Sequence, residues 1–240
     1  MKLITFDFWN TLFLDRHEGI RHSKRVAFAH EVLQRYHPSL PETKVAGGFE
    51  KAHQEYLRQW ENRRAFTMDL HVGHMLRCLH LAISAADFRS IVDYFESVLL
   101  EYPPVVIDHA VEAVRHVASR MKVGLISDTG YSPGRTLRQI LAGHNMENCF
   151  HAFSFSNETG FLKPNPQAFG RILEKLDIRP EDAVHVGDLE ETDIAGAKKI
   201  GMKAIRYVGA DPVTDRQSIA DAVIDDLGIL PFVLNDLFKE

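Results

Sequence analysis

Cysteine is scarce in this chain, since only Cys78 and Cys149 occur among its 240 residues. Two cysteines do not make a disulfide framework, so we expect the reducing environment of the cytoplasm. A long apolar run is missing as well. The apolar stretch at the N-terminus is interrupted by Asp7 and is far too short to span a bilayer or to act as a signal peptide. We therefore expect no membrane partner.

Positive charge is in slight deficit, with 28 Lys and Arg against 33 Asp and Glu and a formal net charge of -5. Such a balance provides no basic surface, so we expect no nucleic-acid partner. Internal repeats, low-complexity tracts and Gly/Ser linkers are also absent. With 45% hydrophobic residues in 240, the chain suits one α/β domain with a sizeable insert. Nothing in the pattern indicates an oligomeric state.

The spacing of apolar residues changes along the chain. From about Glu18 to Tyr102 they recur every three or four positions, which is typical of amphipathic helices. Ser84 followed by Asp87 resembles a helix N-cap. We expect four helices packed as a small bundle over residues 15–102.

After the helical segment, short apolar strands alternate with helices, which predicts a parallel, doubly wound α/β sheet. The core is expected over residues 1–14 and 103–240. Its predicted strands after the first are 105–107, 122–127, 152–155, 183–187, 203–207 and the edge strand 222–224. Its predicted helices include 136–142, 166–176 and 192–200.

Polar residues follow several of these strands. Asp7 ends the first strand, Ser127 and Asp128 end the strand 122–127, and Asp188 follows the strand 183–187. Because such sheets bind ligands outside the carboxyl ends of their strands, these side chains should converge. Asp193 lies about one helical turn after Asp188. Clustered carboxylates suit a hard divalent cation such as Mg²⁺.

Lys163 begins the segment Lys163-Pro164-Asn165-Pro166, a rigid turn before a helix. Taken in order, Asp7, Ser127, Lys163 and the Gly187-Asp188…Asp193 segment resemble the motifs of the haloacid dehalogenase superfamily of hydrolases. Most of its members are magnesium-dependent phosphatases. The resemblance covers the whole chain and implies a Rossmann-like core, Mg²⁺ as cofactor and a small phosphorylated substrate. It also implies that residues 15–102 form a cap that opens and closes over the substrate.

The resemblance assigns a role to each residue that matches a motif. Asp7 would attack phosphorus to give an aspartyl-phosphate, and Ser127, Asp128 and Lys163 would hold the phosphate. Asp128 stands where relatives often have Asn, which leaves a backbone contact possible. Asp7, Asp188 and the Trp9 backbone carbonyl would hold the metal, with Asp193 as the second acid that fixes the geometry of this metal site.

Trp9 is the one departure from the family pattern, which has a second Asp two residues after the nucleophile. In phosphatases of the family, that Asp protonates the leaving oxygen and then activates water. Losing a general acid-base costs about 10² to 10⁴ in rate, and an indole N–H does not shuttle a proton at neutral pH. We therefore expect slow turnover, or turnover restricted to good leaving groups such as acyl or aryl phosphates, unless Asp15 or a cap residue substitutes.

Three alternatives stay open. In the first alternative, the protein is a 2-haloacid dehalogenase, because halide leaves without a proton. Relatives with that activity, however, usually lack the Gly-Asp…Asp metal pair that this chain has. In the second, the protein binds a phosphorylated ligand or a partner with little or no turnover. Or it would cleave phosphonates through an imine on a cap lysine, with Lys24, Lys44 and Lys51 as candidates. His71, His74 and Cys78 fall on one helical face and have the side chains to ligate a soft metal, but a partly buried amphipathic helix is the favoured interpretation of this segment.

Overall fold

The computed structural model describes residues 2–211 and 217–238. The chain forms two compact units. The first, which we call the sheet unit, comprises Met1–Arg16, Pro104–Asp128 and Arg138–Glu240. The second, the helical unit, comprises His17–Pro103 and Thr129–Leu137. Each unit is described by itself below.

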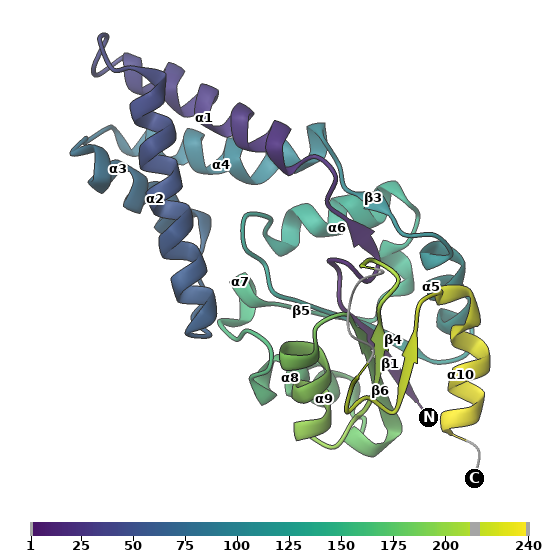
Figure 1. Ribbon diagram of the computed structural model, residues 1–240. Coiled ribbons are helices and arrows are strands. Elements are labelled where there is room, and N and C mark those ends of the chain that lie inside the picture. The colour runs from purple at the N-terminus through teal and green to yellow at the C-terminus, as the bar shows by residue number, and fades with distance from the viewer. Residues whose placement is uncertain (1, 212–216, 239–240) are drawn as a thin grey trace. The chain divides into compact units, whose positions relative to one another are not determined.

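The sheet unit is built on six parallel strands in the order β5-β4-β1-β6-β7-β8 (Figure 1). The predicted α/β fold class with a parallel sheet is therefore confirmed. The strands are β1 (Leu3–Phe6), β4 (Lys122–Ser127), β5 (Ala152–Phe155), β6 (Ala183–Gly187), β7 (Lys203–Tyr207) and β8 (Ala222–Ile224). The α-helices of this unit are α5 (Ala110–Ala118), α7 (Ser156–Thr159), α8 (Pro166–Leu176), α9 (Ala195–Lys199) and α10 (Leu230–Leu237). The helix α6 (Gly134–Gly143) begins in the helical unit and continues into the sheet unit at Arg138.

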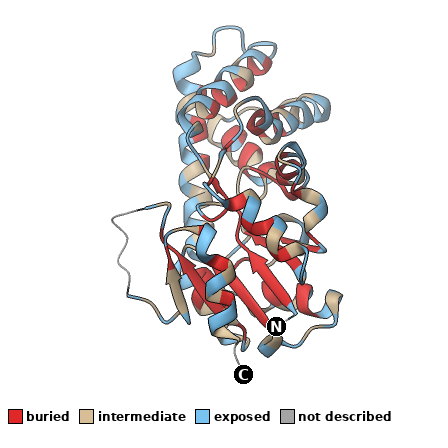
Figure 2. Cartoon of the chain, turned by 90° about the vertical axis from the view of Figure 1, so that its right-hand side faces the viewer, coloured by how far each residue is buried: buried red, intermediate tan, exposed pale blue. Residues whose placement is uncertain are grey.

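Strand β1 lies in the middle of the sheet, between β4 and β6. Its residues Leu3, Ile4 and Phe6 have no solvent exposure, which agrees with the continuous apolar run expected for a parallel strand covered on both faces. Figure 2 shows the strands of the sheet as mostly buried. The sheet is therefore a rigid base for residues that follow the strand ends.

Two predicted elements differ from the observed ones. Val105–Val106 (β3) pairs antiparallel with Phe13–Leu14 (β2) in a separate two-stranded ribbon, so it is not a strand of the parallel sheet. The predicted helix 192–200 is instead a π-helical turn, Glu190–Ile194, followed by the short helix α9. A π-turn widens the helix by one residue, and in this chain it contains Asp193.

The helical unit consists mainly of four helices, α1 (Glu18–Gln34), α2 (Glu42–Glu61), α3 (Met68–Leu79) and α4 (Ala85–Glu101). Apolar side chains from all four form one buried cluster that includes Val32, Phe49, Val72 and Phe95. The helix α4 begins at the N-cap Ser84, whose hydroxyl accepts a hydrogen bond from the Asp87 N–H. That contact satisfies one of the free N–H groups of the first turn.

The segment Thr129–Leu137 also belongs to the helical unit. Tyr131 packs against the buried cluster of this unit, and its hydroxyl lies 2.7 Å from His53 Nδ1. The Arg25 guanidinium stacks over the Tyr131 ring at 4.8 Å from the ring centroid. The part of the chain that directly follows Asp128 is thus tied to helices α1 and α2.

Within residues 2–211 and 217–238, none of the helices combines the length and apolar character needed to cross a bilayer.

Candidate active site

The carboxyl ends of three neighbouring strands bring the predicted site residues together. In the sheet register, Phe6 of β1 lies beside Leu125 of β4 and Val186 of β6. Asp7 follows Phe6, and its backbone N–H donates to the Val186 C=O at 2.9 Å. Ser127 and Asp188 each lie two residues beyond the partners of Phe6. One edge of the sheet therefore carries all three.

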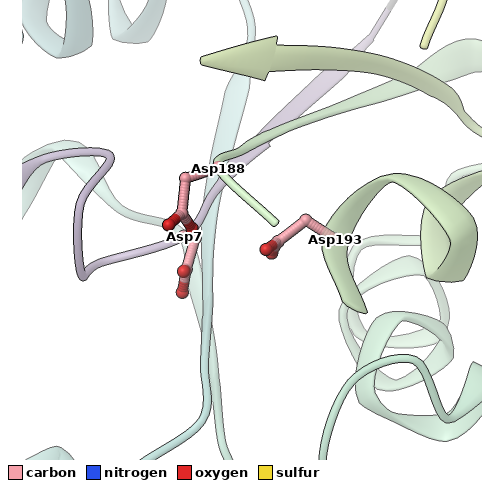
Figure 3. A group of neighbouring side chains, drawn as sticks. All are labelled: Asp7, Asp188 and Asp193. Atoms are coloured by element: carbon pink, nitrogen blue, oxygen red, sulfur yellow. The ribbon is translucent and has the colours of Figure 1, made fainter. Parts of the chain in front are cut away.

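Three carboxylates converge at this edge (Figure 3). One oxygen from each of Asp7, Asp188 and Asp193 lies within 4.8 Å of the other two. Among the described residues, these three form the one group of His, Cys, Asp or Glu side chains that are close enough together to hold a metal ion. Gly187 permits this approach, since a Cβ at that position would lie 2.5 Å from the Asp193 Cβ. The sheet edge and the π-helical turn together build an acidic cluster.

Lys163 is the cation of the site. Its Nζ lies 2.7 Å from Asp7 Oδ1 and 2.7 Å from Asp193 Oδ1, and its side chain is 3% exposed. Its backbone N–H donates to Asp128 Oδ1 at 3.0 Å. Burial by itself would lower the pKa of Lys163, but Asp193, Asp7 and Asp128 outweigh burial and raise the pKa above its ordinary value. Lys163 is therefore held as an ammonium between two carboxylates.

Asp193 has hydrogen-bond donors on both of its oxygens. Oδ1 accepts from Lys163 at 2.7 Å and lies 2.9 Å from His185 Nε2. Oδ2 accepts from the Leu189 N–H and from the Thr192 hydroxyl, each at 3.2 Å. Burial opposes ionisation of Asp193, but Lys163 and His185 outweigh it and hold the pKa well below its usual range. Asp193 is therefore an anion fixed by the protein.

The pKa values of Asp7 and Asp188 are raised, whereas that of Asp193 is lowered. Burial raises the pKa of Asp7 well above its ordinary value, and the charges of Asp193 and Asp188 add to this effect against Lys163. Burial, then Asp193, raises the pKa of Asp188 to about 6, although a hydrogen bond from Asn10 opposes the shift. One ammonium thus does not neutralise the cluster. A bound divalent cation with oxygen preference would, and these donors fit Mg²⁺.

Ser127 and Asp128 lie at the end of β4. Ser127 is 1% exposed, and its hydroxyl has no hydrogen-bond partner among the residues that the structure describes. A buried hydroxyl without a partner is costly, so this group is suited to donating to a ligand at the strand end. Asp128 anchors the Lys163 backbone by accepting its N–H, a contact that was not predicted from the sequence.

Trp9 lies in the tight turn that follows Asp7. The turn is closed by the Asn10 N–H to the Phe13 C=O at 2.8 Å and by the Leu12 N–H to the Phe8 C=O at 3.0 Å. Asn10 has a positive φ of 53°, which Asn tolerates better than most residues. The Trp9 ring meets Phe8 edge-on at a centroid distance of 4.9 Å. Asp15 is exposed beyond β2 and is not one of the clustered acids.

His185 and Thr5 belong to the site and were not predicted. His185 is fully buried in β6, where it links Thr5 Oγ1 to Asp193 Oδ1. Burial is the largest effect on the pKa of His185 and lowers it, although Asp193 acts in the opposite direction. The signal in the sequence was a histidine inside an apolar strand, because a buried polar side chain requires a partner.

His71 lies in the core of the helical unit and takes no part in an acidic or metal-binding group of the described residues. It is 1% exposed, and its Nε2 has no hydrogen-bond partner within residues 2–211 and 217–238. Its ring centroid lies 4.7 Å from that of Phe49 and 5.0 Å from that of Tyr131. Burial, then the Arg25 charge, lowers the pKa of His71 to about 3. The ring is therefore neutral in the folded protein.

A stability loss in mild acid is expected from His71. The pKa of His71 in the folded protein is about 3, below the ordinary value of 6.5. Below pH 6.5, protonation of His71 therefore favours the unfolded chain, and the loss of unfolding free energy grows as the pH falls toward 3. Between pH 7 and 5 it amounts to about 2 kcal/mol. Urea unfolding at both pH values, on the natural protein and His71→Leu, isolates this contribution. An equal loss in both proteins would contradict it.

Solved structures resemble this chain over nearly its whole length. A 2-haloacid dehalogenase from Pseudomonas syringae pv. Tomato DC3000 has a TM-score of 0.72 at 23% identity, covering 99% of both chains. A HAD phosphatase from Thermococcus onnurineus has a TM-score of 0.67 at 21% identity, covering 98% of both. A putative HAD-hydrolase from Bacillus subtilis, bound to magnesium, has a TM-score of 0.61 at 17% identity and the same coverage. At these identities the likeness defines the fold.

A family model for haloacid dehalogenase-like hydrolases matches residues 1–201. The chain therefore belongs to the haloacid dehalogenase-like hydrolase family, as the motifs predicted.

Curated relatives match parts of the chain. A glyceraldehyde 3-phosphate phosphatase of Methanopyrus kandleri is 36% identical over 96 residues, which cover 38% of this chain and 41% of that protein. The protein of the same description from Pyrococcus furiosus is 34% identical over 116 residues, covering 46% of each. These matches span less than half of either relative. A human haloacid dehalogenase-like hydrolase domain-containing protein 3 is 26% identical over 229 residues, covering 89% of this chain and 85% of that protein.

Proposed function

We propose that this chain is a magnesium-dependent phosphohydrolase that forms an aspartyl-phosphate on Asp7. The observation that carries the proposal is the position of Asp7 at the end of the central strand, 2.7 Å from the buried ammonium of Lys163 and within the acidic cluster. A carboxylate nucleophile next to a fixed cation and a cation site is the arrangement that phosphoryl transfer requires.

In the first step, one Asp7 oxygen attacks phosphorus while the bond from phosphorus to the leaving oxygen breaks. The leaving group departs with the bonding electron pair, and the phosphoryl group remains on Asp7. Lys163 offsets the negative charge on the nucleophile and on the transferring group, and the Ser127 hydroxyl donates to a phosphate oxygen. In the second step, water attacks phosphorus, which releases inorganic phosphate and restores Asp7.

Asp7, Asp188 and the Trp9 backbone carbonyl would hold Mg²⁺, and Asp193 would fix the geometry through Lys163 and the Leu189 N–H. When bound, Mg²⁺ would neutralise negative charge on the phosphoryl group. It would also favour the ionised forms of Asp7 and Asp188, whose pKa values burial raises. Asp128 contributes by anchoring the Lys163 backbone.

Trp9 restricts the substrates that this site would turn over. A leaving alkoxide needs a proton that Trp9 does not supply at neutral pH, whereas acyl and aryl phosphates release weakly basic anions. We therefore propose a small phosphorylated metabolite with a good leaving group, hydrolysed slowly. The phosphatase names of partial relatives support a small phosphorylated substrate. The helical unit would serve as the substrate cap.

A second candidate function is the binding of a phosphorylated ligand with little turnover. Trp9 favours it, because loss of the general acid-base leaves Asp7, Ser127 and Lys163 able to hold phosphate without releasing it efficiently. Both candidates use the same phosphate site, so one experiment separates them.

Phosphorus NMR of near-stoichiometric protein with acetyl phosphate, with and without magnesium, tests the proposal. We expect magnesium-dependent release of inorganic phosphate or a protein-bound phosphoryl signal, and neither in Asp7→Asn, which lacks a nucleophilic carboxylate. Accumulation of the bound signal would report how strongly Trp9 slows hydrolysis. An unchanged spectrum in the natural protein would contradict the hydrolase and favour the phosphate-binding function.

A further inference from the structure

His185 occupies a polar position inside the apolar strand β6 and contacts two other elements. Its Nδ1 lies 2.9 Å from Thr5 Oγ1, and its Nε2 lies 2.9 Å from Asp193 Oδ1. Thr5 and His185 are direct register partners in the parallel β1–β6 pair, so the first contact follows from the pairing of the strands. All three side chains are almost fully buried. The ring is thus held at both of its nitrogens.

The chemistry of the two partners determines where the proton of His185 lies. An ionised carboxylate only accepts, so Nε2 carries the proton and donates to Asp193. Nδ1 of the neutral ring then accepts, and the Thr5 hydroxyl supplies the proton. The other acceptor for that hydroxyl, the Val184 carbonyl, is farther away at 3.4 Å. Donation therefore runs in one direction, from Thr5 through His185 to Asp193.

This chain of hydrogen bonds ends on the oxygen that also holds the lysine. Asp193 Oδ1 accepts from Lys163 at 2.7 Å, and the same Nζ lies 2.7 Å from Asp7 Oδ1. Without the His185 donor, Asp193 Oδ1 keeps only Lys163 as a partner, while Oδ2 keeps the Leu189 N–H and the Thr192 hydroxyl. The Asp193 carboxylate is then oriented less firmly on the side of Lys163, and Lys163 shifts relative to Asp7. Groups that orient a site residue in this way typically contribute about 10- to 100-fold to activity.

We infer that His185 is a positioning residue: with Thr5, it orients Asp193 so that Lys163 is aimed at Asp7. This inference rests on the proposed function for its effect on rate, whereas the proton position on His185 is a property of the folded chain alone. The two are therefore tested by separate measurements on the full-length protein.

Steady-state hydrolysis of p-nitrophenyl phosphate at saturating magnesium compares His185→Leu with His185→Gln. Leu removes the donor, and we expect kcat to fall about 10- to 100-fold with KM changed less than about threefold, since phosphate binding by Ser127 stays. Gln offers an amide N–H to Asp193 and a carbonyl to Thr5, so it should recover most of kcat. Equal losses in both variants, with the fold retained by circular dichroism, would assign His185 to core packing and overturn the inference.

Nitrogen NMR of histidine-labelled protein supplies the readout that does not depend on activity. The signals that disappear in His185→Gln identify this ring among the 13 histidines. We expect a neutral imidazole with its proton on Nε2. A proton on Nδ1 would point a lone pair at Asp193 and would overturn the positioning role. If the natural protein hydrolyses neither acetyl phosphate nor p-nitrophenyl phosphate, the proposed function fails, and the NMR result still decides the role of His185.

Discussion

A Trp9→Asp variant is expected to hydrolyse alkyl phosphates about 10²- to 10⁴-fold faster than the natural protein, the range that a general acid-base contributes. The substituted carboxyl would stand two residues beyond Asp7, in the turn closed by Asn10 and Phe13. It would protonate the leaving oxygen in the first step and take a proton from water in the second. The backbone carbonyl of residue 9 is kept, so the proposed metal ligands do not change.

A Trp9→Asn variant is the matched control, because Asn has the shape of Asp but does not transfer a proton at neutral pH. Initial rates with an alkyl phosphate and with acetyl phosphate should be measured for both variants. The alkyl substrate should separate them more strongly, because acetate leaves without a proton and acetyl phosphate therefore reports only the second step, in which the carboxyl activates water. Equal rates on the alkyl substrate, with magnesium bound and the fold intact, would show that the missing acid does not limit turnover.

Lys163→Met is expected to destabilise the folded protein by about 3–5 kcal/mol, the cost of leaving a buried charge without its partner. Asp7 and Asp193 each lie 2.7 Å from Lys163 Nζ, and the lysine side chain is 3% exposed. The variant leaves these carboxylates facing each other with no cation between them. Magnesium should recover part of the loss, because a ligand that binds the folded state stabilises it.

Urea unfolding with and without magnesium measures this effect, and Lys2→Met provides the control. Lys2 pairs with Asp182 at 3.3 Å, but its side chain is 65% exposed, and exposed pairs contribute about 0–1 kcal/mol. The two lysine variants therefore remove the same charge from opposite environments. Similar losses of unfolding free energy would indicate that Asp7 or Asp193 is neutral in the folded protein.

Much of the fold could be predicted because its signals are local. The apolar runs 152–155, 183–187 and 203–207 coincide with β5, β6 and β7, and the Ser84 N-cap begins α4. The acidic cluster was also accessible from the sequence, since Asp7 and Asp188 follow strands whose carboxyl ends share an edge. Strand order was not needed for that prediction. The family follows from the same motifs.

Features that depend on pairing between distant residues could not be read. The contact of Thr5 with His185 requires the register of β1 against β6, and a one-residue change in register would send these side chains elsewhere. The short strand Val105–Val106 resembled a sheet strand because its composition does not reveal its partner, Phe13–Leu14. The π-helical turn Glu190–Ile194 likewise places Asp193 in contact with Lys163 and with His185 of β6, both of which lie outside the turn.

The segment that follows Asp128 limits how freely the two units could be exchanged in evolution or in the laboratory. Residues 129–137 fold with the helical unit, where Tyr131 contacts His53 and a Cβ at Gly130 would lie 2.5 Å from the Tyr56 hydroxyl oxygen. A chimera that replaces only residues 17–103 would leave this segment facing a surface for which it was not selected. A transplanted helical unit must therefore carry both pieces, although more than twenty residues of the sheet unit separate them in the chain.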